Sequence, residues 1–157
     1  MRRSLACGML VAGLTALAAP ASAAPPTPVD DYALEVDAGG ACPFPVTIVL
    51  NGKGKAIDVG GMRQIVTSPG LTAVVTNRDT GRQVAYVVTG TFHHETLEGG
   101  NVVTIATGRN LLLDPQAGFV LTTGRYTYTM AADGVTNVEP LRRLGGPEPV
   151  DVCADVA

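Results

Sequence analysis

The segment "LTAVVTNRDTGRQVAYVVT", residues 71–89, consists of two runs rich in valine and threonine on either side of a turn sequence. In that turn, Gly81 is placed to adopt the left-handed conformation that a hairpin loop requires. The second run, residues 82–89, is apolar on both of its alternating faces, which is typical of a strand covered on both sides. The segment therefore predicts a β-hairpin inside an antiparallel sheet.

Turn sequences recur from Val46 onward, and short runs of β-forming residues separate them. Asp133-Gly134 is a second strong hairpin signal, and Gly90 interrupts what would otherwise be a very long strand, which predicts a bulge or a corner. No segment after residue 23 shows a sustained helical stripe of apolar residues. We therefore expect an all-β, single-domain antiparallel fold of about eight or nine short strands, either a β-sandwich or a closed β-barrel.

The first residues, "MRRSLACGMLVAGLTALAAPASAAPP", have the pattern of a secretory signal peptide. Two arginines precede an apolar run over residues 5–19, and the small residues Ala21-Ser22-Ala23 follow it. This run is shorter than the roughly 20 residues that span a bilayer, which favours cleavage after Ala23 over a membrane anchor. We therefore assign residues 1–23 to a signal peptide, and we expect a secreted, extracellular protein with no transmembrane segment in the mature chain.

Cys7 raises an alternative, in which this cysteine becomes the lipidated first residue of a lipoprotein. Only six residues precede Cys7, so no apolar stretch lies before it, and Ser4 stands where an aliphatic residue is expected. Release of the mature chain after cleavage therefore fits the sequence better than lipidation at Cys7. The proline-rich residues 24–40 then form a leader and a first extended segment, and residues 41–157 form the β-domain.

The charge pattern argues against nucleic acid as a partner. The chain has 11 basic and 14 acidic residues, and removal of Arg2 and Arg3 would leave nine basic residues and a formal charge of −5. The remaining basic residues are scattered, so they form no electropositive stripe for a polyanion. We expect the partner to be an unknown protein or a component of the cell envelope, and we expect no cofactor.

Two cysteines, Cys42 and Cys153, remain after the signal peptide is removed. Disulfides persist in the oxidising compartment to which such a chain is exported, so we expect a bridge between them. A bridge across a loop of about 110 residues stabilises by roughly 4 to 5 kcal/mol in the chain-entropy model. A metal pair or an intermolecular bridge is the alternative, but neither has supporting residues nearby in the sequence.

Both histidines lie in "TFHHETLEGG", residues 91–100, and a carboxylate follows them directly. On a strand, His93 and Glu95 share one face about 6 to 7 Å apart, while His94 lies on the other face with Phe92. A zinc site would therefore need His93, Glu95 and a ligand from a neighbouring strand. These two residues are weak metal or acid–base candidates, and a polar strand followed by a turn is the simpler interpretation.

Other chemistries have weaker signals. Ser68 is the one serine after residue 23, and it lies beside a turn-forming proline rather than in a GxSxG motif. "NGKGKA", residues 51–56, lacks the spacing of a phosphate-binding loop and predicts a hairpin turn with two solvated lysines. Tyr126 and Tyr128 share a strand face, and they form either a small sugar-binding platform or, more simply, half-buried packing. The sequence therefore assigns no catalytic residue.

The segments "CPFPVTI", "TSPGLTAVVTNRDTGRQV", "VVTIATGRNLLLDPQAG", "LTTGRYTYT" and "DVCADVA" together resemble a group of small secreted β-rich proteins of high-GC Gram-positive bacteria. The resemblance spans most of the chain after residue 23, including both of its cysteines. It implies secretion and a single compact domain, and it implies no catalytic residue, because that group has no established activity. We therefore expect a secreted β-domain that acts by surface contact, as an interaction, envelope-associated or ligand-binding module.

The alternative is a small extracellular hydrolase or metal-dependent enzyme that uses His93 and Glu95, although the sequence favours a protein that is not an enzyme. A third hypothesis is an inhibitor of secreted enzymes, for which "LLLDPQAG", residues 111–118, is the one mildly suggestive connection. The hypotheses differ in whether a neighbouring strand brings a third ligand or a catalytic partner to the His93 face.

Overall fold

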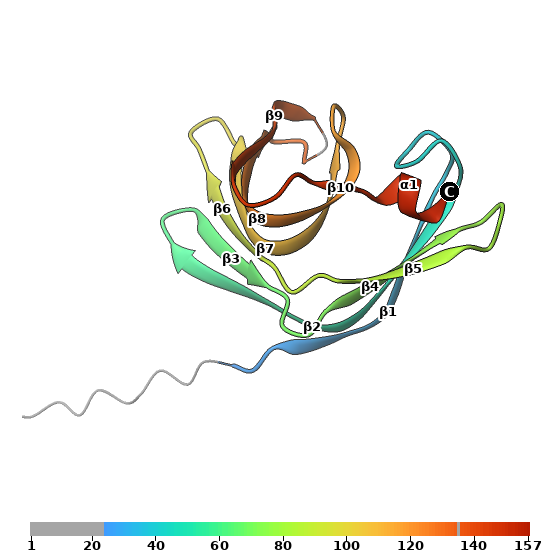
Figure 1. Ribbon diagram of the computed structural model, residues 1–157. Coiled ribbons are helices and arrows are strands. Elements are labelled where there is room, and N and C mark those ends of the chain that lie inside the picture. Colours follow the sequence, from blue (N-terminus) through green and yellow to red (C-terminus); the bar gives the residue numbers. More distant parts are fainter. Residues whose placement is uncertain (1–23, 135) are drawn as a thin grey trace, which may run out of the picture.

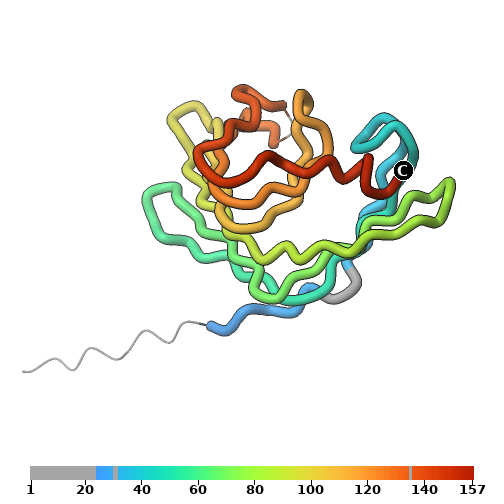
Figure 2. Tube along the Cα trace, in the orientation of Figure 1, coloured from blue at the N-terminus to red at the C-terminus, as the bar shows by residue number. Residues whose placement is uncertain are grey.

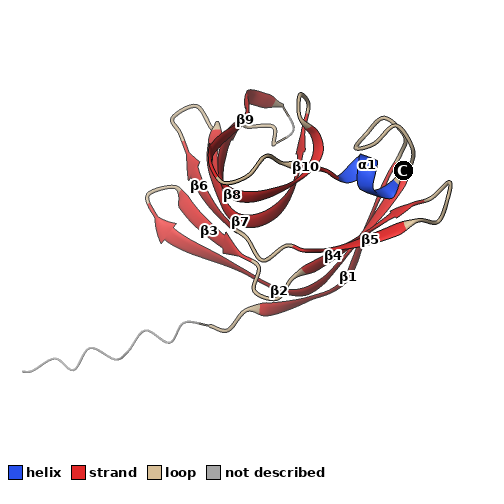
Figure 3. Cartoon of the chain, viewed as in Figure 1, coloured by secondary structure: helices blue, strands red, loops and turns tan. Residues whose placement is uncertain are grey.

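The computed structural model describes residues 24–134 and 136–157, which form ten β-strands and one short helix (Figure 1). The predicted signal peptide, residues 1–23 with Cys7, lies outside these residues. The elements are β1 (Thr27–Val36), β2 (Val46–Gly60), β3 (Arg63–Thr67), β4 (Thr72–Asn77), β5 (Gln83–Val87), β6 (Thr91–Thr96), β7 (Val102–Asp114), β8 (Gly118–Met130), β9 (Asn137–Gly145), β10 (Val150–Asp151) and α1 (Val152–Val156). Strands dominate the fold, as Figure 3 shows, so the all-β prediction is confirmed.

All strand pairs are antiparallel, as expected. The sheet follows the order β10-β8-β7-β6-β3-β2-β4-β5, with β1 paired to β2 and β9 paired to β8. Within the described residues no pairing joins the β5 end of this path to the β10 end, so the sheet is not closed. α1, which directly follows β10, packs against β4 and β5 at the other end of this path.

β2 is a single strand of 15 residues, and it runs through the segment for which the sequence predicted a turn. The turn predicted at residues 51–56 is therefore wrong. Gly52 has a φ of 141°, and a Cβ at this position would lie 2.6 Å from the backbone oxygen of Gly70. The glycine lets two backbone segments approach closely at a corner of the sheet, and the strand continues past it.

Two short strands, β3 and β4, pair with β2 and are separated by residues 68–71. The strands that pair with them, β6 and β5, are separated in the same way by residues 88–90. The interruption predicted at Gly90, as a bulge or a corner, is confirmed by the break between β5 and β6. β7 pairs with β6 only as far as Thr107, and from Gly108 onward it pairs with β8 alone. The tip of the β7–β8 hairpin therefore leaves the sheet at Gly108 and rises from it, which the trace in Figure 2 makes visible.

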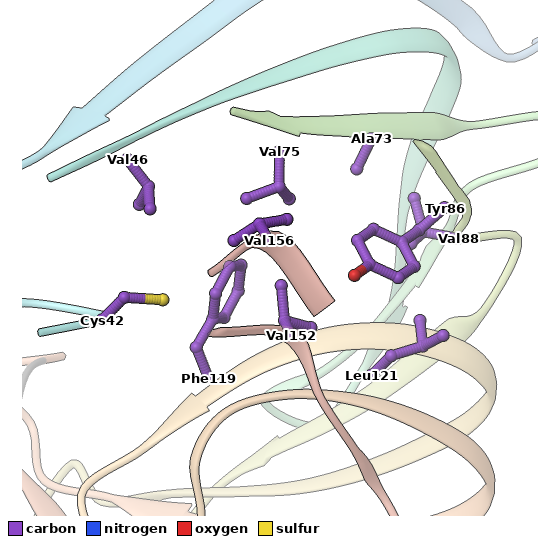
Figure 4. Close-up of a cluster of buried hydrophobic side chains, with 10 residues drawn as sticks. All are labelled: Cys42, Val46, Ala73, Val75, Tyr86, Val88, Phe119, Leu121, Val152 and Val156. Atoms are coloured by element: carbon purple, nitrogen blue, oxygen red, sulfur yellow. The ribbon is translucent and has the colours of Figure 1, made fainter. Parts of the chain in front are cut away.

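The main core lies in the wedge between this raised hairpin tip and the inner face of β2, β4 and β5. Figure 4 shows Phe119 of β8 on one side of the wedge and Val46 and Val75 on the other. Val152 and Val156 of α1 are fully buried between the two sides. A smaller cluster lies on the opposite face of the hairpin and contains Ala106, Leu112, Val120 and Tyr126.

α1 is short, and its surroundings hold it in place. The Asp151 side chain accepts hydrogen bonds from the backbone N–H groups of Cys153 and Ala154, which caps the helix. Cys153 is bonded to Cys42 with a Cα–Cα distance of 5.5 Å, so the predicted disulfide is confirmed. The bridge holds the C-terminal residues beside the loop that precedes β2 (Figure 2). Within residues 24–134 and 136–157, no helix has the length and apolar character that crossing a bilayer requires.

β1 occupies most of residues 24–40, which the sequence assigned to a leader and a first extended segment. It is extended, and it pairs with β2 from Thr27 to Val36 with one irregularity between Val29 and Tyr32. The paired part of the chain therefore begins before residue 41. β1 lies at an edge of the sheet, where Tyr32 and Leu34 are 56% and 44% exposed.

Candidate functional site

The predicted site residues His93 and Glu95 lie on β6, between β3 and β7, and both are exposed. The cross-strand neighbours of His93 are Ile65 and Ile105. Glu95 lies opposite Arg63 on β3 and an apolar valine on β7. Among the residues that the structure describes, no three histidine, cysteine, aspartate or glutamate side chains are grouped so that they could hold a metal ion. The neighbouring strands therefore bring no third ligand to this face.

A groove of about 510 Å³ covers the same face. His93, Glu95, Arg63 and Arg125 line it together with apolar side chains of β3 and β7. A general base needs a partner that orients it, and no described residue forms a hydrogen bond with the His93 ring. The groove offers a surface of mixed polar and apolar side chains rather than an assembled set of catalytic groups.

His94 lies on the opposite face, as the strand alternation predicted. Its ring is stacked on Phe92 with 5.8 Å between centroids, and its Nδ1 is 2.9 Å from the hydroxyl oxygen of Thr104. Burial lowers the pKa of His94 below its ordinary value of 6.5, and the charge of His93 acts in the same direction. His94 is therefore a neutral packing residue of the inner face.

The two tyrosines of β8 do not form an exposed platform. Tyr126 is 1% exposed, and its hydroxyl donates to the backbone oxygen of Pro147 over 2.6 Å. Tyr128 is half-buried, and burial raises the pKa of both hydroxyl groups. The packing interpretation of this pair fits these contacts.

The segment that suggested an inhibitory loop is mostly strand, because residues 111–114 end β7 and Gly118 begins β8. Asp114 is 3% exposed, and its carboxylate accepts backbone hydrogen bonds from Gln116, Ala117 and Leu141. Burial acts to raise the pKa of Asp114, but these hydrogen bonds outweigh it and hold the pKa below 3.8. The turn is fastened to β9 and presents no long free loop.

A predominantly apolar pocket of about 310 Å³ lies in the wedge. Its walls come from the first two strands and from the raised hairpin tip, and they include Leu34, Ile48, Leu50, Leu111, Leu113 and Phe119. α1 fills the β5 side of the wedge, whereas the β1 side holds this pocket. Leu34 and Leu113 remain 44% and 56% exposed at the mouth.

Two polar residues, Ser68 and Asn110, line the pocket beside the corner at Gly90. Asn110 is 3% exposed, and its Nδ2 donates to the backbone oxygen of Thr107 over 3.1 Å. The backbone N–H of Ser68 donates to the oxygen of Gly90 over 3.2 Å. Neither histidine lines this pocket, so Ser68 has no general base within it.

Sequence reasoning did not find this pocket, because its walls come from strands that are about 60 to 85 residues apart in the chain. The sequence holds no local signal for it, because Asn110 follows Arg109 and precedes the apolar residues 111–113, where a polar side chain is unremarkable.

No protein-family model, curated protein sequence or solved structure matches the chain. The fold and the surfaces described above are therefore the basis for assigning a function.

Proposed function

We propose that this protein is an exported, disulfide-closed ligand-binding module that takes an apolar ligand into the wedge pocket. The observation that supports the proposal most directly is the open mouth of the pocket, where Leu34 and Leu113 are exposed above apolar walls. Concave apolar sites with a few polar groups are the usual form of small-molecule sites, with volumes of about 300 to 1,000 Å³. At about 310 Å³ the pocket lies at the small end of that range.

The architecture explains why the pocket exists. One side of the wedge is completed by α1 and the bridge between Cys42 and Cys153, whereas no element of the described chain completes the other side. We place the fold closer to a sandwich than to a barrel, since among the described residues β8 and α1 pack on the inner face of β4 and β5 with no strand pairing between them. Side-chain hydrogen bonds join α1 to these two strands, from Asn77 Nδ2 to the Val156 backbone oxygen and from the Tyr86 hydroxyl to Asp155. A sandwich with one open side leaves room for a ligand to act as part of the core.

Export is supported by the signal-peptide pattern and by the disulfide, which persists in oxidising compartments. The resemblance to secreted bacterial proteins points the same way. In such a setting, contact with a component of the cell envelope or with a molecule outside the cell is the expected mode of action. The hydrolase or metal-enzyme alternative stays a prediction, and the neighbours of His93 lend it no support.

The test uses an apolar fluorescent dye and two single substitutions of exposed leucines. Leu113→Asp places a charge at the mouth of the pocket, and Leu97→Asp places the same charge at the β6–β7 turn, where the leucine is 42% exposed. Burying one leucine side chain contributes about 1.5 to 3 kcal/mol, so we expect dye affinity to fall at least about tenfold in Leu113→Asp.

We expect Leu97→Asp to bind the dye as the original protein does. Equal affinities for all three proteins, or no binding by the original protein, would contradict the proposed function.

A further inference from the structure

Asn110 places an unused hydrogen-bond acceptor at the pocket. Its Nδ2 donates to the backbone oxygen of Thr107, and only the nitrogen of the amide can do so, which fixes the identity of the other atom as Oδ1. No described residue donates to Oδ1. No fully buried side-chain nitrogen or oxygen among the described residues lacks a hydrogen bond, so Oδ1 must retain contact with open space. Asn110 lines the wedge pocket, and we assign the open space beside Oδ1 to that pocket.

The packing around Gly90 holds this amide in place. A Cβ on Gly90 would lie 1.9 Å from Oδ1 and 2.5 Å from Nδ2, so the amide occupies the space that any other residue would fill. The backbone oxygen of Gly90 also accepts the Ser68 N–H, which brings Ser68 to the same corner. The Ser68 hydroxyl forms no hydrogen bond with a described residue, and it can donate or accept. The corner thus presents one fixed acceptor and one adaptable hydroxyl.

The remaining lining of the pocket carries no charge. Its 13 residues include no lysine, arginine, histidine, aspartate or glutamate. An ionised ligand would lose its hydration on entering and would find no counter-charge, which is costly. An uncharged polar group would instead exchange its water for Ser68 and Asn110.

We infer that the wedge pocket selects a small neutral amphiphile, with an alkyl or aryl body against the leucines and a hydroxyl or amide group at the Ser68–Asn110 corner. This inference rests on the proposed function, because it names the ligand class of the same pocket. The polar group must donate to Asn110 Oδ1, and a hydroxyl or an amide can also accept from Ser68. Space of about 310 Å³ corresponds to roughly ten water volumes, which fits a ligand of about ten non-hydrogen atoms.

Calorimetric titration with three ligands of nearly equal size tests the inference on the unaltered protein. 1-Octanol has the apolar body and the donor, heptyl methyl ether has the same atoms without the donor, and octanoate is ionised at neutral pH. We expect 1-octanol to bind roughly three- to tenfold tighter than the ether, the effect of one net hydrogen bond, and octanoate to bind more weakly than both.

Variants then test whether Ser68 and Asn110 cause the preference for 1-octanol over the ether. In the double variant Ser68→Ala with Asn110→Ala we expect 1-octanol and the ether to bind equally. Ser68→Ala alone breaks no side-chain hydrogen bond to a described residue, and it should reduce the preference. Thr127→Val removes a half-buried hydroxyl from β8 outside the pocket and should leave the preference unchanged.

The outcomes separate the two proposals. Equal binding of 1-octanol and the ether to the unaltered protein, or octanoate binding as tight as that of 1-octanol, would overturn the ligand class while leaving an apolar site. Failure of all three ligands, together with failure of the dye, would overturn the proposed function itself.

Discussion

His93 and His94 are adjacent in the chain and differ in almost every physical respect. His93 is exposed on the groove of the outer face, whereas His94 is half-buried, stacks on Phe92 and contacts Thr104. Strand alternation places successive side chains on opposite faces, and this alone makes one histidine a surface group and the other a packing group.

The His94 environment predicts a pH dependence of stability. Because burial lowers the pKa of His94 below 6.5, the unfolded chain binds a proton more readily than the folded protein does. The contribution of His94 is therefore fully present above about pH 6.5, and it is lost as the pH falls through the lower folded pKa. Urea unfolding between pH 7.5 and pH 5 should show a falling free energy of unfolding.

His94→Gln keeps a polar side chain on β6 but cannot titrate, so it should flatten this part of the pH profile. A profile of the same slope in His94→Gln would mean that another group controls stability in this range. Asp114 does not affect this comparison, since its contribution to the free energy of unfolding is lost only at pH values below 3.8.

At the residue scale, the sequence predicted on which face of a strand a side chain lies, but not which residues lie beside it on the neighbouring strands. Period-two alternation correctly separated His93 from His94, and it could not reveal that isoleucines flank His93 on both sides. Cross-strand neighbours depend on register, which is set by turns and packing far along the chain. Ser68 and Asn110 were unpredictable as a pair for the same reason.

At the scale of elements, the hairpins were predictable because their turns are local. The turns that precede β5 and β7 are where the glycines indicated them, and the break at Gly90 was expected. The sequence predicted a turn at residues 51–56 where β2 in fact continues, because Gly52 and Gly54 suggest a turn when the neighbouring chain is unknown. The departure of the β7–β8 hairpin at Gly108 depends on contacts with Gly90, 18 residues earlier, and no local pattern contains it.

At the corner between β5 and β6, replacing glycine by alanine should destabilise the protein, whereas the same replacement in β9 should not. Gly90→Ala would place a Cβ 1.9 Å from Asn110 Oδ1, so either the amide or the corner must shift. Overpacking of this kind costs about 1 to 3 kcal/mol, which should appear as a lower urea midpoint.

Gly145→Ala in β9 is the matched control. A Cβ there meets nothing within 4 Å, and Gly145 does not adopt a positive φ, so its unfolding midpoint should change little. Equal urea midpoints for the two variants would contradict the prediction, because they would mean that the corner at Gly90 accommodates a Cβ without loss of stability.

At the scale of the whole molecule, fold class and bridge were accessible from the sequence, and the arrangement of the sheet was not. Composition and turn spacing indicate an all-β chain, and two cysteines allow one intramolecular pairing. Whether a sheet closes depends on where strands stop pairing, as β7 does after Thr107. That point is decided by packing of the raised hairpin over the core, which no single segment encodes.

The disulfide should account for a large part of the stability. Cys42 and Cys153 are 111 residues apart, and their bridge fastens α1 over the wedge. We expect the double variant Cys42→Ala with Cys153→Ala to lose about 2 to 5 kcal/mol in urea unfolding. Adding a reductant should destabilise the original protein by a similar amount and leave the variant unchanged. A variant as stable as the oxidised protein would contradict this role of the bridge.

The position of α1 in the chain has a consequence for how the protein is made. α1 follows all ten described strands, yet Val152 and Val156 are fully buried between the two sides of the wedge. A ribosome adds about 5 to 20 residues per second, so the interval between synthesis of Cys42 and of Cys153 is on the order of ten seconds. During that interval the cover over the apolar faces of β2, β4 and β5 is incomplete, and a nascent chain would depend on chaperones to keep it from aggregating.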